Sequence, residues 1–412
     1  MTDVVITGLG ATSPLGGDVS STWEGALAGR SGVRTFDNDW VEQYDLPVHF
    51  SGQLAVPTAE VLSRPETRRM DPSAQMAMVA AREAWADAGS PEVDHDRLGA
   101  VVSSGIGGIW TLLNGWDTMK EKGAGRVLPM SVPMLMPNSP AAYVSLEFKA
   151  RAGAHAPVSA CASGAEAIGT AFEMIQSGRA DIVIAGGTEA ATHPLPIAAF
   201  AAMAALSKRN NDPQGASRPY DTSRDGFVLG EGSGIVVVES AEHAKARGAR
   251  VYARLLGLGM TADGHHIAAP EPNGTGQTKA MQFALERAGI TTTDVSHVNA
   301  HATSTPVGDM IEARGIRGLL GSHADSVLLS ATKSMTGHLL GGAGALESVF
   351  TIKALAERTA PPTINVTEPD PELEVDLVRD TPRALPADGQ LAAINNSFGF
   401  GGHNVALVFG TA

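Results

Sequence analysis

The segment Val4-Val5-Ile6-Thr7-Gly8-Leu9-Gly10-Ala11-Thr12 is a short run of β-forming residues closed by glycines. Its pattern Gly-Leu-Gly-x-Thr returns later in the chain as Gly257-Leu258-Gly259-Met260-Thr261. A pattern that recurs at a distance indicates an internally duplicated fold. We therefore predict two halves that meet near residue 255, residues 1–255 and residues 256–412.

Strand-like and helix-like runs alternate through both halves. Apolar runs typical of strands lie at residues 98–103, 181–185, 234–239, 295–299, 327–331 and 391–396. Between them, residues 165–177 and 278–288 each place apolar side chains on one helical face. The alternation predicts two α/β halves in which sheets are sandwiched between helices.

The composition is that of a large globular enzyme. The chain has 412 residues, more than the roughly 250 to 300 at which a single core stops growing. Its 47 glycines and 18% charged residues are typical of an α/β protein with many tight turns. The net charge of −14 argues against general nucleic-acid binding, because phosphate contacts need a basic face.

Three features bear on location. The first residues lack the basic region of a signal peptide. The longest apolar stretch, residues 194–206, is shorter than the roughly 20 residues of a membrane helix. A single cysteine cannot form an internal disulfide, so no oxidising compartment is required. We expect a cytoplasmic protein with no membrane span.

The single cysteine, Cys161, lies in Val158-Ser159-Ala160-Cys161-Ala162-Ser163-Gly164, between an apolar run and an expected helix. A lone cysteine is most often a small buried residue. At the N-terminus of a helix, however, free N–H groups and the helix dipole favour the thiolate, which is the nucleophilic form. Cys161 is therefore a candidate nucleophile.

Three stretches of the second half follow expected strands and carry polar residues among small ones. They are residues 299–309, which contain His301, residues 331–345, which contain Lys333 and His338, and residues 395–404, which are rich in glycine. Strand ends are where α/β folds keep their chemistry. Each stretch alone also fits a structural role, as a core histidine, a capped helix or a tight turn.

Nucleotide and metal sites are not supported by the sequence. Gly8-Leu9-Gly10 lacks the third glycine and the acidic residue of a dinucleotide fingerprint, and no phosphate-binding Gly-x-x-x-x-Gly-Lys-Ser/Thr occurs. There is no His-Glu-x-x-His, and we expect no catalytic metal.

Five motifs together resemble one family, the elongating β-ketoacyl-acyl-carrier-protein synthases of type II fatty acid synthesis. They are Ser159-Ala160-Cys161-Ala162-Ser163-Gly164, Asp225-Gly226-Phe227-Val228-Leu229-Gly230-Glu231-Gly232, His301-Ala302-Thr303-Ser304-Thr305, Lys333-Ser334-Met335-Thr336-Gly337-His338 and Gly399-Phe400-Gly401-Gly402. The resemblance covers essentially the whole chain, in order. It implies the thiolase-like fold, duplicated βαβαβαββ halves stacked as a five-layer αβαβα sandwich, in a homodimer.

The sequence also distinguishes this chain from other families that resemble the thiolase-like fold. Thiolases use a second cysteine, which this chain lacks. Initiating condensing enzymes and chalcone-type synthases have an asparagine where this chain has His338. A chain-length-factor subunit would lack the nucleophilic cysteine, whereas Cys161 is present. Two residues depart from the common pattern, Ala302 in place of Gly and His403 in place of Thr. We take both as marks of a subgroup.

The resemblance implies roles for particular residues. Cys161 would accept the acyl group, with its own N–H and that of Phe400 as the oxyanion hole, and His301 and His338 would stabilise the enolate that forms when malonyl carrier protein loses CO₂. Lys333 and Glu347 would form a buried pair that orients the site. Thr303 and Thr305 would hydrogen-bond the phosphopantetheine arm. Phe398 and Phe400 would also bind substrate, with Phe400 as the gate between acylation and decarboxylation. Ile106 matches a residue that lines the acyl pocket, although ordinary core packing explains it equally well.

Partners follow from the same resemblance. Acyl carrier proteins are acidic, so the basic residues Arg64, Arg68, Arg69, Lys208 and Arg209 are candidates for docking them. From charge alone, these residues equally fit a solvated surface. No redox cofactor is needed, and some relatives bind a monovalent cation near Asn299, Glu347 and Asn396. Two alternatives stay open, a type II polyketide ketosynthase and a non-catalytic structural or chain-length subunit.

Overall fold

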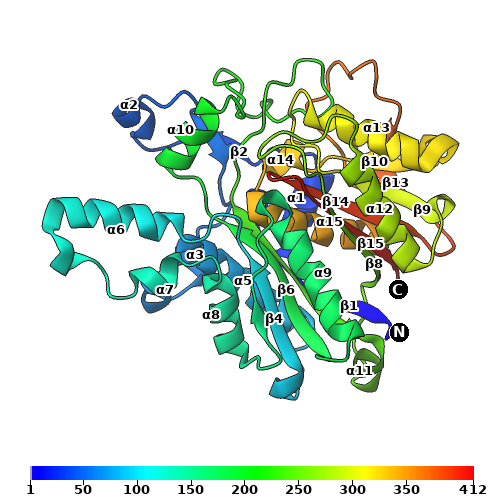
Figure 1. Cartoon of the computed structure of the whole chain (residues 1–412), viewed down its shortest axis with the longest axis horizontal. Coiled ribbons are helices and arrows are strands. Elements are labelled where there is room, and N and C mark those ends of the chain that lie inside the picture. Colours follow the sequence, from blue (N-terminus) through cyan, green and yellow to red (C-terminus); the bar gives the residue numbers. More distant parts are fainter. Residues whose placement is uncertain (1) are drawn as a thin grey trace.

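The computed structural model describes residues 2–412, which are built around one mixed sheet of eleven strands (Figure 1). In spatial order the strands are β12 (Asp376–Leu377), β10 (Leu328–Ser330), β9 (Val295–Asn299), β14 (Ala392–Gly399), β15 (His403–Thr411), β8 (Ala253–Ala262), β1 (Val4–Thr12), β7 (Gly232–Ser240), β6 (Ile182–Glu189), β4 (Leu98–Ser103) and β5 (Ala154–His155). Nearly all residues of the central strands are buried, because helices cover both faces.

The strand order is duplicated. From the middle outward, β1-β7-β6-β4-β5 and β8-β15-β14-β9-β10 have the same sequence of two antiparallel and then two parallel pairings. The two halves join where residues 4–6 of β1 pair with residues 253–255 of β8. The predicted duplication is therefore confirmed, whereas the boundary at residue 255, which falls inside β8, stays a prediction.

Helices form three layers that alternate with the two half-sheets, as expected for the thiolase-like sandwich. The layers are, in order, α5 (Pro72–Asp87) with α8 (Ser139–Phe148), α9 (Ser163–Gln176) with α15 (Ala343–Glu357), and α12 (Thr275–Ala288) with α13 (Gly308–Leu320). The apolar faces predicted for residues 165–177 and 278–288 are the buried faces of α9 and α12. Helix α15 is buried along nearly its whole length, since both half-sheets pack on it.

The repeated glycines explain how the outer helices pack. An added Cβ atom on Gly8 or Gly10 would lie 2.2 or 1.9 Å from a carbonyl oxygen of α5. The same atom on Gly257 or Gly259 would lie 2.1 or 1.9 Å from a carbonyl oxygen of α12. Only glycine allows a strand and a helix to approach so closely, so the repeated pattern records one packing arrangement used twice.

The shorter elements lie around this frame. They are α1 (Val19–Leu27), α2 (Trp40–Tyr44), α3 (Thr58–Val61), α4 (Arg64–Thr67), α6 (Ile109–Lys122), α7 (Ser131–Leu135), α10 (Pro194–Ala202), α11 (Ala241–Ala246), α14 (Lys333–Thr336), β2 (Val33–Thr35), β3 (Phe50–Gly52), β11 (Thr359–Ala360), β13 (Arg383–Ala384) and the 3₁₀ turns η1 (His95–Arg97), η2 (Ala124–Arg126), η3 (Ala160–Ala162), η4 (Thr292–Asp294), η5 (Gly321–Ser326) and η6 (Leu340–Gly342). Helices α6 and α7 project away from the sheet (Figure 1). Among residues 2–412, no helix is both long and apolar enough to cross a membrane.

Candidate active site

Cys161 sits on a sharp turn at the start of the central helix α9. It belongs to η3, which leads directly into that helix, and Ala160 before it has a positive φ of 51°. Such a backbone is unfavourable for a residue with a side chain, so neighbouring contacts must hold it. The hydroxyl of Ser163 does so, because it donates to the Ala160 carbonyl at 2.7 Å and accepts from the Ser159 N–H at 2.9 Å. These two hydrogen bonds stabilise the turn that carries Cys161.

The Cys161 side chain is 7% exposed, at the floor of a cavity of about 530 Å³. Burial raises the pKa of the Cys161 thiol to about 12, although the nearby Lys333 ammonium acts in the opposite direction. The sequence had suggested that the helix N-terminus would favour the thiolate. Burial outweighs that effect, so the resting group is a thiol.

The glycine-rich loop between β14 and β15 closes over the cysteine. The backbone N–H groups of Phe400 and of Cys161 itself lie within hydrogen-bond reach of the sulfur. An added Cβ on Gly399 would stand 2.3 Å from the Ser159 carbonyl oxygen and 3.1 Å from the Cys161 nitrogen. Glycine at this position therefore lets two N–H donors converge beside the nucleophile.

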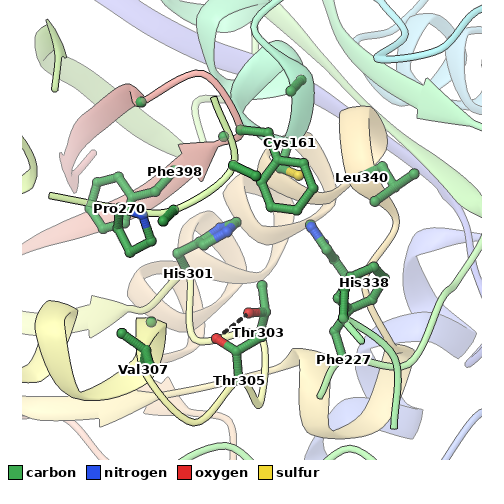
Figure 2. Close-up of a pocket in the computed structure, with 18 of the residues that line it drawn as sticks. Cys161, Phe227, Pro270, His301, Thr303, Thr305, Val307, His338, Leu340 and Phe398 are labelled. Carbon is green, nitrogen blue, oxygen red and sulfur yellow. Dashed lines mark hydrogen bonds between the residues drawn. The ribbon is translucent and has the colours of Figure 1, made fainter. Parts of the chain in front are cut away.

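His301 and His338 lie on the opposite side of the cavity. Figure 2 shows both rings directed toward Cys161, His301 from the loop after β9 and His338 from the turn after α14. Their ring centroids are 5.4 Å apart and the rings are nearly perpendicular, at 86°. Burial, with the charge of Lys333, holds the pKa of both histidines well below the ordinary value. Both rings are therefore neutral at pH 7, as the proposed enolate role requires.

The motif at residues 225–232 holds the backbone of His338 in place. Its N–H donates to the Val228 carbonyl at 2.7 Å, and its carbonyl accepts from the Gly230 N–H at 2.9 Å. The Phe227 ring packs edge-on against the imidazole, with the two ring centroids 5.4 Å apart. The segment 225–232 thus positions a histidine that lies more than a hundred residues away in the sequence.

Lys333 and Glu347 form the buried pair that the resemblance implied. The Lys333 ammonium donates to the Glu347 carboxylate at 2.5 Å, and the two side chains are 1% and 3% exposed. Burial raises the pKa of Glu347 to about 7, although Lys333 lowers it. A pair so far from water places a fixed positive charge beside the histidines.

Glu312 belongs to the site, although sequence reasoning did not select it. This buried carboxylate on α13 accepts the N–H groups of His301 and Ala302, each at 2.8 Å, and the side-chain amide of Asn396 at 3.0 Å. It therefore fixes the loop that carries the first histidine. No spacing in the sequence marks it, because two of its three partners are backbone groups and the third, Asn396, is distant in the sequence.

The three residues near which some relatives of the resembled family bind a monovalent cation each carry a buried, unpartnered side-chain oxygen. Oδ1 of Asn299, Oε2 of Glu347 and Oδ1 of Asn396 have no hydrogen-bond partner among the described residues. Amide and carboxylate oxygens are the donors that hard cations prefer. No group of three or more His, Cys, Asp or Glu side chains anywhere in residues 2–412 is arranged to hold a metal ion.

The remaining predicted substrate residues line the same cavity. Thr303 and Thr305 lie side by side on the rim below the histidines, with their hydroxyl oxygens 3.3 Å apart (Figure 2). Phe398 packs against the His301 ring at 5.7 Å, and Phe400 is 37% exposed in the closing loop. Ile106, 38% exposed, lines the cavity and so is not an ordinary core residue.

The predicted docking residues lie outside the cavity. Arg64 begins α4, and Arg68 and Arg69 follow that helix directly, all three exposed. Lys208 is also exposed. Arg209 is half-buried, and its guanidinium donates to the Ser223 carbonyl at 3.0 Å. These positions leave most of the basic groups free for a partner.

Comparisons with known proteins match nearly the whole chain to one family. Residues 1–244 match the family model of the β-ketoacyl synthase N-terminal domain, and residues 252–367 match that of the C-terminal domain. The chain is 47% identical over 408 residues to "3-oxoacyl-[acyl-carrier-protein] synthase 2" of Mycobacterium tuberculosis, covering 99% of this chain and 97% of that protein. It is 46% identical over 409 residues to the protein of that name from Staphylococcus aureus strain N315, covering 98% and 97%.

Solved structures agree in fold. A ketosynthase solved in complex with its type II polyketide acyl-carrier protein, bound to a hexaketide, matches with a TM-score of 0.92 at 31% identity, covering 100% of this chain and 99% of that one. A β-ketoacyl synthase from Burkholderia phymatum matches with a TM-score of 0.90 at 36% identity, covering 100% of both chains.

Proposed function

The chain belongs to the β-ketoacyl synthase family, and we propose that it condenses acyl-acyl-carrier protein with malonyl-acyl-carrier protein, giving 3-oxoacyl-carrier protein and CO₂ in fatty acid elongation. The observation that carries this function is the convergence of Cys161, His301 and His338 on one cavity. The enzyme is an acyltransferase that works through an acyl-cysteine intermediate.

The first half-reaction is a thioester exchange. The Cys161 sulfur attacks the acyl carbonyl, while the N–H groups of Cys161 and Phe400 stabilise the oxyanion. The tetrahedral intermediate then collapses, the bond to the pantetheine sulfur breaks, and the proton lost by the Cys161 thiol ends on that leaving sulfur. Because burial raises the pKa of the Cys161 thiol to about 12, we propose that the thiol loses its proton while the sulfur attacks the carbonyl, and not before.

The second half-reaction uses the histidines. When malonyl carrier protein loses CO₂, the electron pair of the broken bond forms an enolate, whose oxygen accepts hydrogen bonds from the ring N–H groups of His301 and His338. The enolate carbon attacks the acyl thioester, and the Cys161 sulfur leaves as a thiolate, which takes a proton from water to restore the resting thiol. Neutral rings suit this step, since Lys333 and burial prevent their protonation.

The other residues bind and guide the substrate. Thr303 and Thr305 hydrogen-bond the phosphopantetheine arm, and Ile106 borders the acyl chain. Phe400, at the tip of the glycine loop, opens for acylation and closes for decarboxylation. A cation held by Asn299, Glu347 and Asn396 would offset negative charge behind the site; no step passes through it.

Partners follow from the surface. The exposed arginines at and after α4, with Lys208 and Arg209, attract the acidic carrier protein. A homodimer is supported by the apolar side chains that α6, α7 and their connection expose; they include Leu112, Trp116, Leu128 and Val132, each at least half exposed. Carrier-protein substrates agree with the cytoplasmic location expected from the sequence.

The polyketide alternative has one observation in its favour, the close fold match to a polyketide ketosynthase. That match has 31% identity, whereas the relatives named 3-oxoacyl-[acyl-carrier-protein] synthase 2 reach 47%. The presence of Cys161 argues against a purely structural subunit.

Intact mass measurement after incubation with acyl carrier proteins of graded chain length tests the proposal. We expect one acyl adduct, absent from a Cys161→Ala variant, that converts to 3-oxoacyl-carrier protein when malonyl-carrier protein is added. An enzyme that forms no adduct and releases no CO₂ would contradict the function. Activity that appears only with a copurifying cysteine-less partner would favour the polyketide alternative.

A further inference from the structure

The turn before α15 repeats the turn that carries the nucleophile. In the first half, η3 precedes α9 and Ala160 has a φ of 51°. In the second half, η6 precedes α15 and Leu340 has a φ of 46°. Gly341 stands one residue after Leu340, as Cys161 stands one residue after Ala160. The duplicated fold therefore contains a second nucleophile turn without a nucleophile.

The two helices that follow these turns cross reciprocally. An added Cβ on Gly164 would lie 2.9 Å from the Cβ of Ala345, and an added Cβ on Gly344 would lie 3.0 Å from the Cβ of Ala165. The same glycine and alanine positions thus meet from both sides. This reciprocity confirms that Gly341 and Cys161 occupy equivalent places.

A buried carboxylate fills the second turn. Glu189, the last residue of β6, is fully buried and accepts four hydrogen bonds. Its Oε2 accepts from the N–H groups of Gly341 at 3.0 Å and Gly105 at 2.8 Å. Its Oε1 accepts from the Ile106 N–H at 3.2 Å and from the Ser104 hydroxyl at 2.6 Å. Three of these four donors are backbone groups, which cannot reverse their role.

The equivalence extends to the strand ends. β6 and β14 hold the same place in the two half-sheets, so Glu189 at the end of β6 corresponds to Gly399 at the end of β14. At the first turn, the Cys161 N–H and the loop after Gly399 leave room for a substrate oxyanion. At the second turn, the Gly341 N–H faces the Glu189 carboxylate instead.

We propose that Glu189 is a positioning residue whose carboxylate permanently occupies, at the second turn, the place that a substrate oxyanion takes at Cys161. By doing so it fastens together three segments that the reaction needs. These are the loop that contains Ile106, the turn three residues after His338, and strand β6 of the first half, which Glu189 itself ends. The proposal rests on the proposed function and adds a residue that holds its two parts in register.

The groups around Glu189 favour a carboxylate over an amide of the same size. Gln has the same size, but its amide nitrogen only donates and would face backbone N–H groups. An added Cβ on Gly105 would lie 2.7 Å from the Glu189 Oε2 atom, and one on Gly341 would lie 2.3 Å from the Gly105 nitrogen and 2.9 Å from Oε2, so both glycines are required by this close packing. Burial raises the pKa of Glu189, while its four hydrogen bonds favour the ionised form.

Glu189→Gln and Glu189→Ala test the role. A shift of about 1 Å in a catalytic group costs on the order of 10²-fold in rate. We expect the kcat of condensation to fall by about that factor in both variants, with the KM for malonyl-carrier protein unchanged because the docking surface is untouched. Glu189→Ala removes the equivalent of one acetate molecule beside the cavity. Added acetate should therefore restore its activity, and the neutral isostere acetamide should not.

Glu239→Gln is the matched control. Glu239 is also a fully buried carboxylate, but it binds Thr7, His243 and Arg247 away from the cavity. This variant should lose thermal stability and keep its kcat. Glu189 variants with wild-type kcat, a parallel rise in KM, or a folded Ala variant that acetate does not rescue would each overturn the proposal. If the Ala variant does not fold, the kcat and KM of Glu189→Gln decide. Wild-type enzyme without condensation would instead contradict the proposed function.

Discussion

The loops after β4 and β9 occupy equivalent places in the two halves, yet they do different work. The first, Ser104-Gly105-Ile106, brings Ile106 to the cavity, and the second, His301-Ala302-Thr303, brings a histidine and a threonine to it. In both loops a buried carboxylate accepts consecutive backbone N–H groups, Glu189 in one and Glu312 in the other.

The difference shows how a duplicated frame becomes one active site. The strand order, the strained turns and the carboxylate clamps are shared, so they belong to the fold. Cys161, the proposed nucleophile, lies in the first half, and His301 and His338, the proposed donors to the enolate, lie in the second. Catalysis therefore depends on a few side chains placed unequally on a nearly symmetric backbone.

The largest effect is expected from making the two turns alike. Cys161→Gly gives the first turn the residue that the second turn has at position 341. The variant keeps the backbone of the turn but has no group to accept the acyl chain, so condensation should fall to background. Product formation from acyl- and malonyl-carrier protein measures this, with iodoacetamide-treated wild type, alkylated at its only thiol, as a matched control. Elongation by either sample would contradict the prediction.

The next effect concerns the second half. His301→Ala and His338→Ala each remove one donor to the enolate oxygen, and loss of one such donor typically lowers the rate by about 10²- to 10³-fold. Decarboxylation of malonyl-carrier protein should fall by that factor in each variant. Release of labelled CO₂ measures it. Unchanged release would place enolate stabilisation on other groups.

Reversing the docking charges should have a smaller effect, on substrate binding and not on the rate of the chemical steps. Arg68→Glu with Arg69→Glu reverses two exposed charges beside α4. The KM for carrier-protein substrates should rise by about tenfold, because rim charges act mainly on the encounter. Small pantetheine thioesters, which lack the acidic protein, provide the control. An equal loss on both substrates would mean that the arginines support the fold and not docking.

The smallest effect concerns the outer helices, which also differ between the halves. On α5, Glu83 accepts the N–H groups of Ala11 and Val19, whereas the corresponding position of α12 is Phe283. Burial raises the pKa of Glu83 from 4.5 to about 7, and the nearby Asp18 and Asp87 act in the same direction. Between these values the folded state holds a proton that the unfolded state releases. Stability should therefore fall as pH rises from about 4.5 to 7.

A pKa difference of one unit corresponds to about 1.4 kcal/mol, so this group contributes on the order of 1–3 kcal/mol to the change. Urea unfolding at pH 5 and pH 7.5 measures it, and Glu83→Gln should flatten the dependence. A Gln variant that keeps the wild-type slope would show that other groups cause it.

The sequence predicted the parts of this molecule whose cause is local or repeated. The Gly-Leu-Gly pattern predicted the duplication because the glycines are required by one helix–strand approach used twice. The motifs around Cys161, His301 and His338 predicted residues that the structure brings to one cavity. Their catalytic roles, like those of Lys333 and Glu347, stay predictions until variants are measured.

The rest depends on contacts between distant segments. Glu189 and Glu312 were not identified from the sequence because most of their partners are backbone N–H groups, which no residue type in the sequence indicates. The protonation state of Cys161 could not be predicted from the sequence for a related reason. The helix N-terminus was visible in the sequence, but the burial that outweighs it comes from loops of both halves.

The central claim is that the first half acylates and the second half decarboxylates. Cys161→Gln and His338→Ala, examined together, test it most directly, because Gln removes the thiol while both histidines remain. Intact acyl-enzyme mass and released CO₂ are measured on the same samples. We predict that Cys161→Gln releases CO₂ without an acyl adduct, and that His338→Ala acquires the adduct with little CO₂. Loss of both activities in both variants, or normal CO₂ release by His338→Ala, would contradict the account.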